Sequence, residues 1–147
     1  MLDGLALELR RLAYDGAIRR CTIPTKGDLV AATGASPEAV ERALQALADA
    51  HMLVLQRDSG EVLMANPFSA VPTAFVVSAG SCTWFGNCIW DSMGIAAMVG
   101  AEVSLDASCG CCGTAMRLAI ANDCQDDERI AHFAVPAAHW WDNIVYS

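Results

Sequence analysis

A cysteine and an aspartate lie three residues apart where a helix is predicted to begin. The stretch "NCIWDSMGIAAM" runs from Asn87 to Met98, and Asn87 belongs to the residue types that cap helices well. We therefore expect Cys88 in the first helical turn, where the partial positive charge of a helix N-terminus favours a thiolate. Asp91 would then lie on the same face of the helix, because residues three apart are neighbours there.

This pair suits a reaction in which sulfur binds a soft atom and a carboxyl group delivers a proton. A carboxylate beside a thiolate is a like-charge pair, so the pKa of Asp91 should rise. A carboxyl group with a raised pKa near a nucleophile is a candidate proton carrier. The spacing alone still favours a structural role, with Cys88 as a small hydrophobic side chain and Asp91 as a charge that favours the helix dipole.

The chain has seven cysteines, an odd and high number for 147 residues. Six of them lie after residue 80, and they are Cys82, Cys88, Cys109, Cys111, Cys112 and Cys124; the seventh is Cys21. The first residues, "MLDGLALELRRLAYDG", carry charges and do not resemble a secretion signal. We therefore expect a cytoplasmic protein without a disulfide scaffold, whose clustered thiols bind metal or act as thiolates.

Composition and charge narrow the class of protein further. Hydrophobic residues make up 54% of the chain, which is ample for a buried core, but no apolar run approaches the ~20 residues of a membrane span. The formal net charge is −8, which argues against a general nucleic-acid-binding protein. We expect an α+β protein with a helical module at residues 1–66, an extended linker at 67–80 and a second domain at 81–147.

Residues 1–66 are predicted to form three helices followed by a hairpin, which is the order of a winged-helix module. Ser36 and Pro37 suit the start of the third helix, and Asp58 to Gly60 suit the hairpin turn. Residues 1–67 hold seven basic and nine acidic side chains, and the helix in the DNA-recognition position is acidic. Phosphate binding needs the opposite sign, so we expect a packing scaffold and no specific DNA binding.

The second domain is predicted to contain a helix and a small sheet. "AEVSLDA" and "TAMRLAI" alternate between apolar and polar residues, as half-buried strands do, and "SCGCCG" lies between them. These segments predict a hairpin with three thiols at its tip. "RIAHFAV", closed by Pro136, is predicted to be a third strand.

The order of these motifs resembles the organomercurial (alkylmercury) lyase family. "CIWD" opens a helix, a strand follows, and Cys109 lies at a hairpin turn behind a degenerate winged-helix module. The resemblance implies that Cys88 binds mercury as a thiolate, that Asp91 carries the proton and that Cys109 has a structural role. It also implies cleavage of a carbon–mercury bond by protonolysis, with a small organomercurial substrate, cellular thiols as partners and no cofactor.

One departure from the family pattern concerns the second catalytic cysteine, which would fall beyond Ser147. The resemblance therefore implies a lyase-like domain that is incomplete at its C-terminus, and mercury binding without efficient cleavage. Cys111, Cys112 and Cys124 are candidates to replace the missing thiolate, and Cys111 and Cys112 are further candidate mercury ligands.

Two alternatives remain open from the residues themselves. The thiols of "CGCC" together with Cys82 or Cys88 would form a zinc or other soft-metal site, although structural zinc sites usually show two separate cysteine pairs. A winged-helix, metal-responsive regulator is the second alternative. The three histidines and four tryptophans are expected to pack or to lie at the surface, with Trp90 beside Cys88 and Trp140 and Trp141 as candidate covers of the site.

Overall fold

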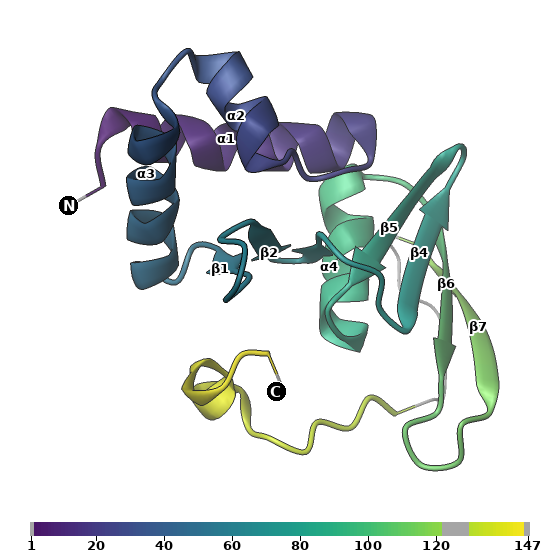
Figure 1. The fold of residues 1–147 in the computed structure, drawn as a ribbon. Helices are drawn as coiled ribbons and strands as arrows, with labels where there is room; N and C mark the ends of the chain where they lie inside the picture. Colours follow the sequence, from purple (N-terminus) through teal and green to yellow (C-terminus); the bar gives the residue numbers. More distant parts are fainter. Residues whose placement is uncertain (1, 122–129, 146–147) are drawn as a thin grey trace.

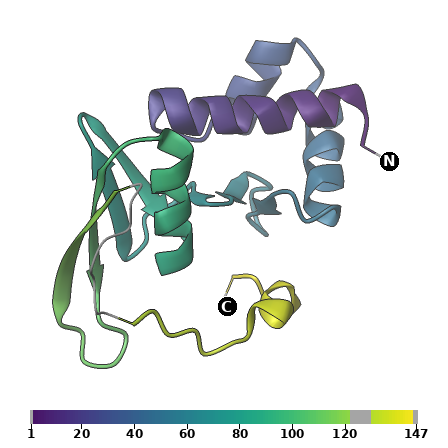
Figure 2. The ribbon, with the colours of Figure 1, turned by 180° about the vertical axis from the view of Figure 1, so that it is seen from behind.

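The computed structural model of the protein describes residues 2–121 and 130–145. Three helices come first, and an antiparallel sheet with a fourth helix follows (Figure 1). The C-terminal residues run past the ends of the sheet and finish below the first hairpin (Figures 1 and 2). The predicted α+β class is confirmed.

Each of the three N-terminal helices begins at a residue whose side chain caps it. Helix α1 (Gly4–Arg20) is capped by the Asp3 carboxylate, which accepts from the Ala6 amide at 2.8 Å. Helix α2 (Lys26–Thr33) has a capping box between Thr25 and Asp28. Helix α3 (Pro37–Asp49) is capped by Ser36 as predicted, and four of its side chains are buried: Val40, Ala43, Leu44 and Leu47.

Seven strands in the described part of the chain form one sheet. They are β1 (Val54–Leu55), β2 (Val62–Ala65), β3 (Phe68–Ser69), β4 (Phe75–Ala79), β5 (Cys82–Gly86), β6 (Val103–Ser108) and β7 (Ala115–Ile120). The order across the sheet is β1-β2-β3-β5-β4-β6-β7, and every neighbouring pair is antiparallel. The predicted hairpins around residue 59 and between β6 and β7 are therefore present.

The predicted linker at residues 67–80 is wrong. This segment contributes β3 and β4, so the sheet continues from the first hairpin into the second half of the chain. Its two prolines lie beside these strands rather than within them, where a missing N–H does not interrupt the ladder. The backbone is extended as expected, but it is paired.

Two groups of buried side chains stabilise the molecule, and α1 contributes to both. Its first half packs against α3, and Leu9 and Leu44 are among the side chains buried there. Its last turns pack against the sheet, where Ala17 lies with Trp84 and the helix α4 (Ile89–Val99). The Trp84 indole N–H donates to the Ala17 carbonyl at 2.7 Å, which satisfies a polar group inside this core.

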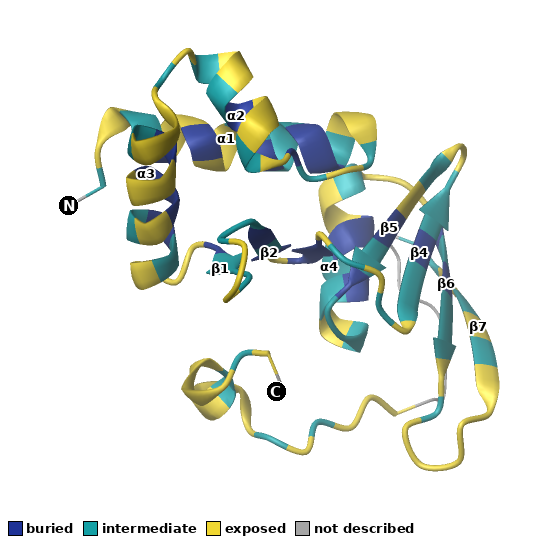
Figure 3. Ribbon diagram, viewed as in Figure 1, coloured by how far each residue is buried: buried dark blue, intermediate teal, exposed yellow. Residues whose placement is uncertain are grey.

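The C-terminal part of the described chain differs from its prediction. A third strand was expected at residues 129–135. Residues 130–135 form no strand, and residue 129 lies outside the described residues. A short 3-10 helix, η1 (Ala137–Asp142), follows. Figure 3 shows that the turn between β6 and β7 is exposed, and β7 alternates between exposed and intermediate residues. Within the described ranges, no helix is long and apolar enough to cross a membrane.

Candidate active site

Cys88 lies at the N-terminus of α4, directly after β5. It is itself the N-cap residue, so the predicted cap at Asn87 is wrong by one position. The Cys88 carbonyl accepts from the Ser92 amide at 3.1 Å and from the Ser92 hydroxyl at 3.0 Å. These two bonds fix the first turn of the helix, and the Cys88 side chain lies beside that turn.

Two glycines allow α4 to approach its neighbours closely at this end. A Cβ at Gly86 would lie 2.6 Å from the Ser92 hydroxyl oxygen, and a Cβ at Gly94 would lie 3.1 Å from the Pro67 ring. Ser92 is fully buried. The turn that carries Cys88 and Asp91 is therefore held between the end of β5 and the chain that leads into β3.

The thiol of Cys88 and the carboxylate of Asp91 face each other, as the spacing predicts. The thiol donates to Asp91 Oδ2 over a sulfur–oxygen distance of 3.8 Å. Both side chains are half-buried. This pair is the arrangement in which a thiol proton can pass directly to a carboxylate.

The pKa of Cys88 is raised, not lowered as the helix N-terminus predicts. Burial of the thiol is the largest cause, because removal from water disfavours the thiolate, and the Asp91 charge raises the pKa further. Backbone N–H groups of Asp91 and Trp90 act in the expected direction, but they are outweighed. The thiol form of Cys88 is therefore favoured over the thiolate.

The pKa of Asp91 is raised, which agrees with the prediction in direction but not in cause. Burial is the largest cause, and not repulsion by a thiolate. Hydrogen bonds from the Asn87 side chain and from the Cys88 thiol lower the pKa in part. A carboxyl group in this setting accepts a proton and keeps it more readily than an exposed aspartate does.

The surroundings of Asp91 include residues that the sequence did not indicate. The Asn87 amide donates to the Asn66 side chain at 3.2 Å, and the Tyr14 hydroxyl donates to the Asn66 carbonyl at 2.9 Å. The Arg10 guanidinium lies over the Tyr14 ring. These contacts join α1 and the β2–β3 turn to the site, over sequence separations that no local pattern reveals.

A labelling experiment tests these pKa directions within one chain. Burial raises the pKa of Cys88, whereas the Thr114 hydroxyl lowers the pKa of Cys112 in the exposed hairpin turn. We expect the iodoacetamide reaction of Cys88 to reach half its maximal rate at a higher pH than that of Cys112. Peptide-resolved mass spectrometry over a pH series measures both midpoints at once. A lower midpoint for Cys88 would contradict the assignment.

The hairpin thiols lie at the same end of the sheet as Cys88. Strands β5 and β6 both pair antiparallel with β4, one on each side of it, so their carboxyl ends lie at the same edge of the sheet, about two strand spacings or ~10 Å apart. Cys88 follows the first of these strands, and Cys109 follows the second. Cys109 is half-buried, whereas Cys111 and Cys112 are exposed.

The alternative of a zinc or other soft-metal site needed the hairpin thiols to lie with Cys82 or Cys88, and the structure places Cys82 elsewhere. Cys21 and Cys82 form a disulfide between the C-cap of α1 and the start of β5, which the sequence did not predict. Cys82 is therefore paired with Cys21 and not with the hairpin thiols. Cys124 lies outside the described residues. Among residues 2–121 and 130–145, no three Cys, His, Asp or Glu side chains come together as a metal site.

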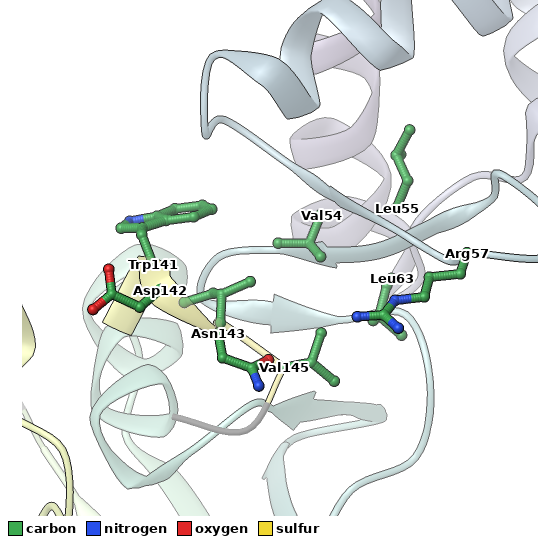
Figure 4. A pocket seen from close by; sticks show the side chains of 9 residues that line it. Val54, Leu55, Arg57, Leu63, Trp141, Asp142, Asn143 and Val145 are labelled. Carbon is green, nitrogen blue, oxygen red and sulfur yellow. The ribbon is translucent and has the colours of Figure 1, made fainter. Parts of the chain in front are cut away.

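One cavity is lined by none of these thiols. It has a volume of about 450 Å³ and lies between the first hairpin and the residues after η1 (Figure 4). Trp141 lines it and stacks on His51, with ring centroids 4.2 Å apart. Trp141 therefore does not cover Cys88 as expected. Trp90 is 59% exposed, whereas Trp84 is buried.

The fold and the site together define an α+β protein with a thiol–carboxylate pair at the start of the helix that packs on its sheet. The sequence model of the MerB family, described as alkylmercury lyase, matches residues 68–147. The match includes Cys88, Asp91 and the hairpin thiols, and it covers more than half of the chain. The protein belongs to the alkylmercury lyase family.

The structural comparison agrees with this family. The chain is similar to a crystal structure of the mercury-bound form of MerB2, with a TM-score of 0.62 and 23% sequence identity. The similarity covers 82% of this chain and 58% of the MerB2 chain, so this chain spans less than two thirds of that protein. The likeness supports the shared fold. No curated protein matches the sequence.

Proposed function

We propose that this chain binds an alkylmercury ion through Cys88 and that Asp91 carries the proton that cleaves the carbon–mercury bond. The observation that carries the proposal is the contact of the Cys88 thiol with Asp91 Oδ2 at 3.8 Å. Membership of the alkylmercury lyase family supports the class of substrate. Mercury is a soft metal, for which a thiolate is the preferred ligand.

The first step is capture of the substrate. The sulfur of Cys88 forms a bond to mercury and releases its proton, which passes to the Asp91 carboxylate beside it. Burial, which raises the pKa of Asp91, favours retention of that proton. Capture therefore loads the acid that the second step needs, without a free thiolate in the resting site.

The second step is protonolysis. A second thiol, from a cellular thiol or from another cysteine of the protein, releases its proton to water and binds mercury as a thiolate, which increases the electron density on the carbon. The carbon–mercury bond then breaks with its electron pair on the carbon, which takes the proton from Asp91 and leaves as a hydrocarbon. Hg(II) remains bound by two sulfurs, and Asp91 returns to the carboxylate form.

Methane release tests this function directly. The full chain is incubated with methylmercury and an excess of a small thiol, and methane is measured in the headspace. We expect methane above the rate given by the thiol alone. The proposal would be wrong if the chain retained methylmercury at Cys88 but released no methane above that background at any pH at which it stays folded.

A further inference from the structure

The turn between β6 and β7 carries three thiols and is closed by backbone hydrogen bonds. The Cys109 amide donates to the Thr114 carbonyl at 2.9 Å, and the Gly113 amide donates to the Cys109 carbonyl at 2.8 Å. Gly113 has a φ of +71°, a left-handed conformation that suits glycine. The bond from Gly113 to Cys109 closes one helix-like turn over residues 109–113, and residues three apart in such a turn, here Cys109 and Cys112, are neighbours on one face.

The surroundings of Cys112 favour its deprotonated form. Its sulfur lies 3.1 Å from the Thr114 hydroxyl oxygen. That hydroxyl is the largest cause of a lowered pKa for Cys112, followed by the Thr114 backbone and the Cys109 thiol. Cys112 is exposed and Cys109 is half-buried, so a metal ion approaches the pair from the solvent side of the turn. The pair thus differs from buried Cys88, whose pKa is raised.

We propose that Cys109 and Cys112 form a two-thiolate site for Hg(II), separate from the Cys88–Asp91 pair. Binding forms two Hg–S bonds and releases one proton from each thiol, with no change in oxidation state. Two thiolates match the preference of this soft ion, and three or four protein ligands are not required. Cys111 lies between them in sequence and is not part of the proposed site.

The position of this site suggests a role as acceptor of the product, and this role rests on the proposed lyase function. The hairpin tip and the N-terminus of α4 lie at the same end of the sheet, as the strand pairing requires and Figure 1 shows. Hg(II) left on Cys88 after protonolysis can exchange onto the hairpin dithiol through a thiol ligand exchange. The exchange frees Cys88 for another alkylmercury ion.

The hairpin site is tested with HgCl₂ as the probe and with Cys88 replaced by serine. Native mass spectrometry counts Hg(II) per chain while a competing monothiol is increased. We expect Cys109→Ser or Cys112→Ser to weaken retention by roughly 10²-fold or more, because a chelating pair becomes a single ligand. Cys111→Ser is the comparison variant: the sequence made Cys111 a candidate mercury ligand, but the proposed site leaves it out. This change removes a thiol from the same turn and should therefore retain Hg(II) unchanged.

Two results would overturn this assignment: equal loss with Cys111→Ser, or no loss with either Cys109→Ser or Cys112→Ser. All three changes lie in an exposed turn, and circular dichroism checks that the fold is retained. Methane release with Cys88 intact separates this inference from the lyase proposal. If no methane is released but the hairpin still retains Hg(II), only the lyase function is contradicted. If methane is released but the hairpin does not retain Hg(II), only the hairpin site is contradicted.

Discussion

Replacing Cys88 by serine is expected to abolish methane release from methylmercury and to remove mercury from α4. A serine hydroxyl has nearly the same shape, but its hard oxygen is a poor ligand for mercury. Loss of the residue that holds the substrate should lower the rate by about 10²-fold or more, as for other positioned catalytic groups. Headspace methane and peptide mapping after stoichiometric methylmercury measure the two effects separately.

Cys111→Ser is the control for this first prediction. It makes the same atomic change at an exposed thiol and should leave methane release unaltered. Equal methane from Cys88→Ser and the unsubstituted chain would show that another thiol holds the substrate. Peptide mapping would then identify it, with the hairpin cysteines as the first positions to compare.

Replacing Asp91 by asparagine should separate binding from cleavage. Asparagine keeps the shape of the side chain but cannot carry the proton from sulfur to carbon. We expect mercury to stay bound at Cys88 while methane release falls by about 10²–10⁴-fold. The Asp91 charge contributes to the raised pKa of Cys88, so the thiol of this variant should deprotonate at a lower pH. Methane at the original rate would exclude Asp91 as the proton carrier.

The same substitution has a defined effect on stability. A carboxyl group whose pKa is raised by folding binds more protons in the native state than in the unfolded state between its two pKa values. The native state therefore loses stability as the pH rises through that interval, and the loss is complete above the folded pKa. Since Asp91 is such a group, Asp91→Asn should unfold at higher urea than the original chain near neutral pH.

Local patterns in the sequence were enough to predict the elements that carry the site. Ser36 with Pro37 marked the start of α3, and the alternation on either side of the three hairpin thiols marked β6 and β7. The three-residue spacing placed Cys88 against Asp91. Each of these features depends on residues close in sequence, so periodicity and capping reveal it.

Features that depend on distant contacts were not predicted. The disulfide joins Cys21 to Cys82, and the Tyr14–Asn66 hydrogen bond spans 52 residues. Strand β3 has only two residues, too few for alternation to be visible. The pKa of Cys88 depends on how far tertiary packing buries the thiol, and packing outweighed the local helix N-terminus. The position of Cys88 in the sequence does not reveal how deeply its thiol is buried.

The contacts of helix α1 decide whether the part of the chain that matches the family, residues 68–147, can be studied in isolation. The family match begins at Phe68, but Ala17 of α1 is buried against the matched sheet and accepts a hydrogen bond from the Trp84 indole. A recombinant fragment that starts at the family boundary would leave this indole unsatisfied and expose the apolar surface around it. The recognisable unit of sequence and the cooperative unit of folding therefore differ, and the second includes residues 4–20.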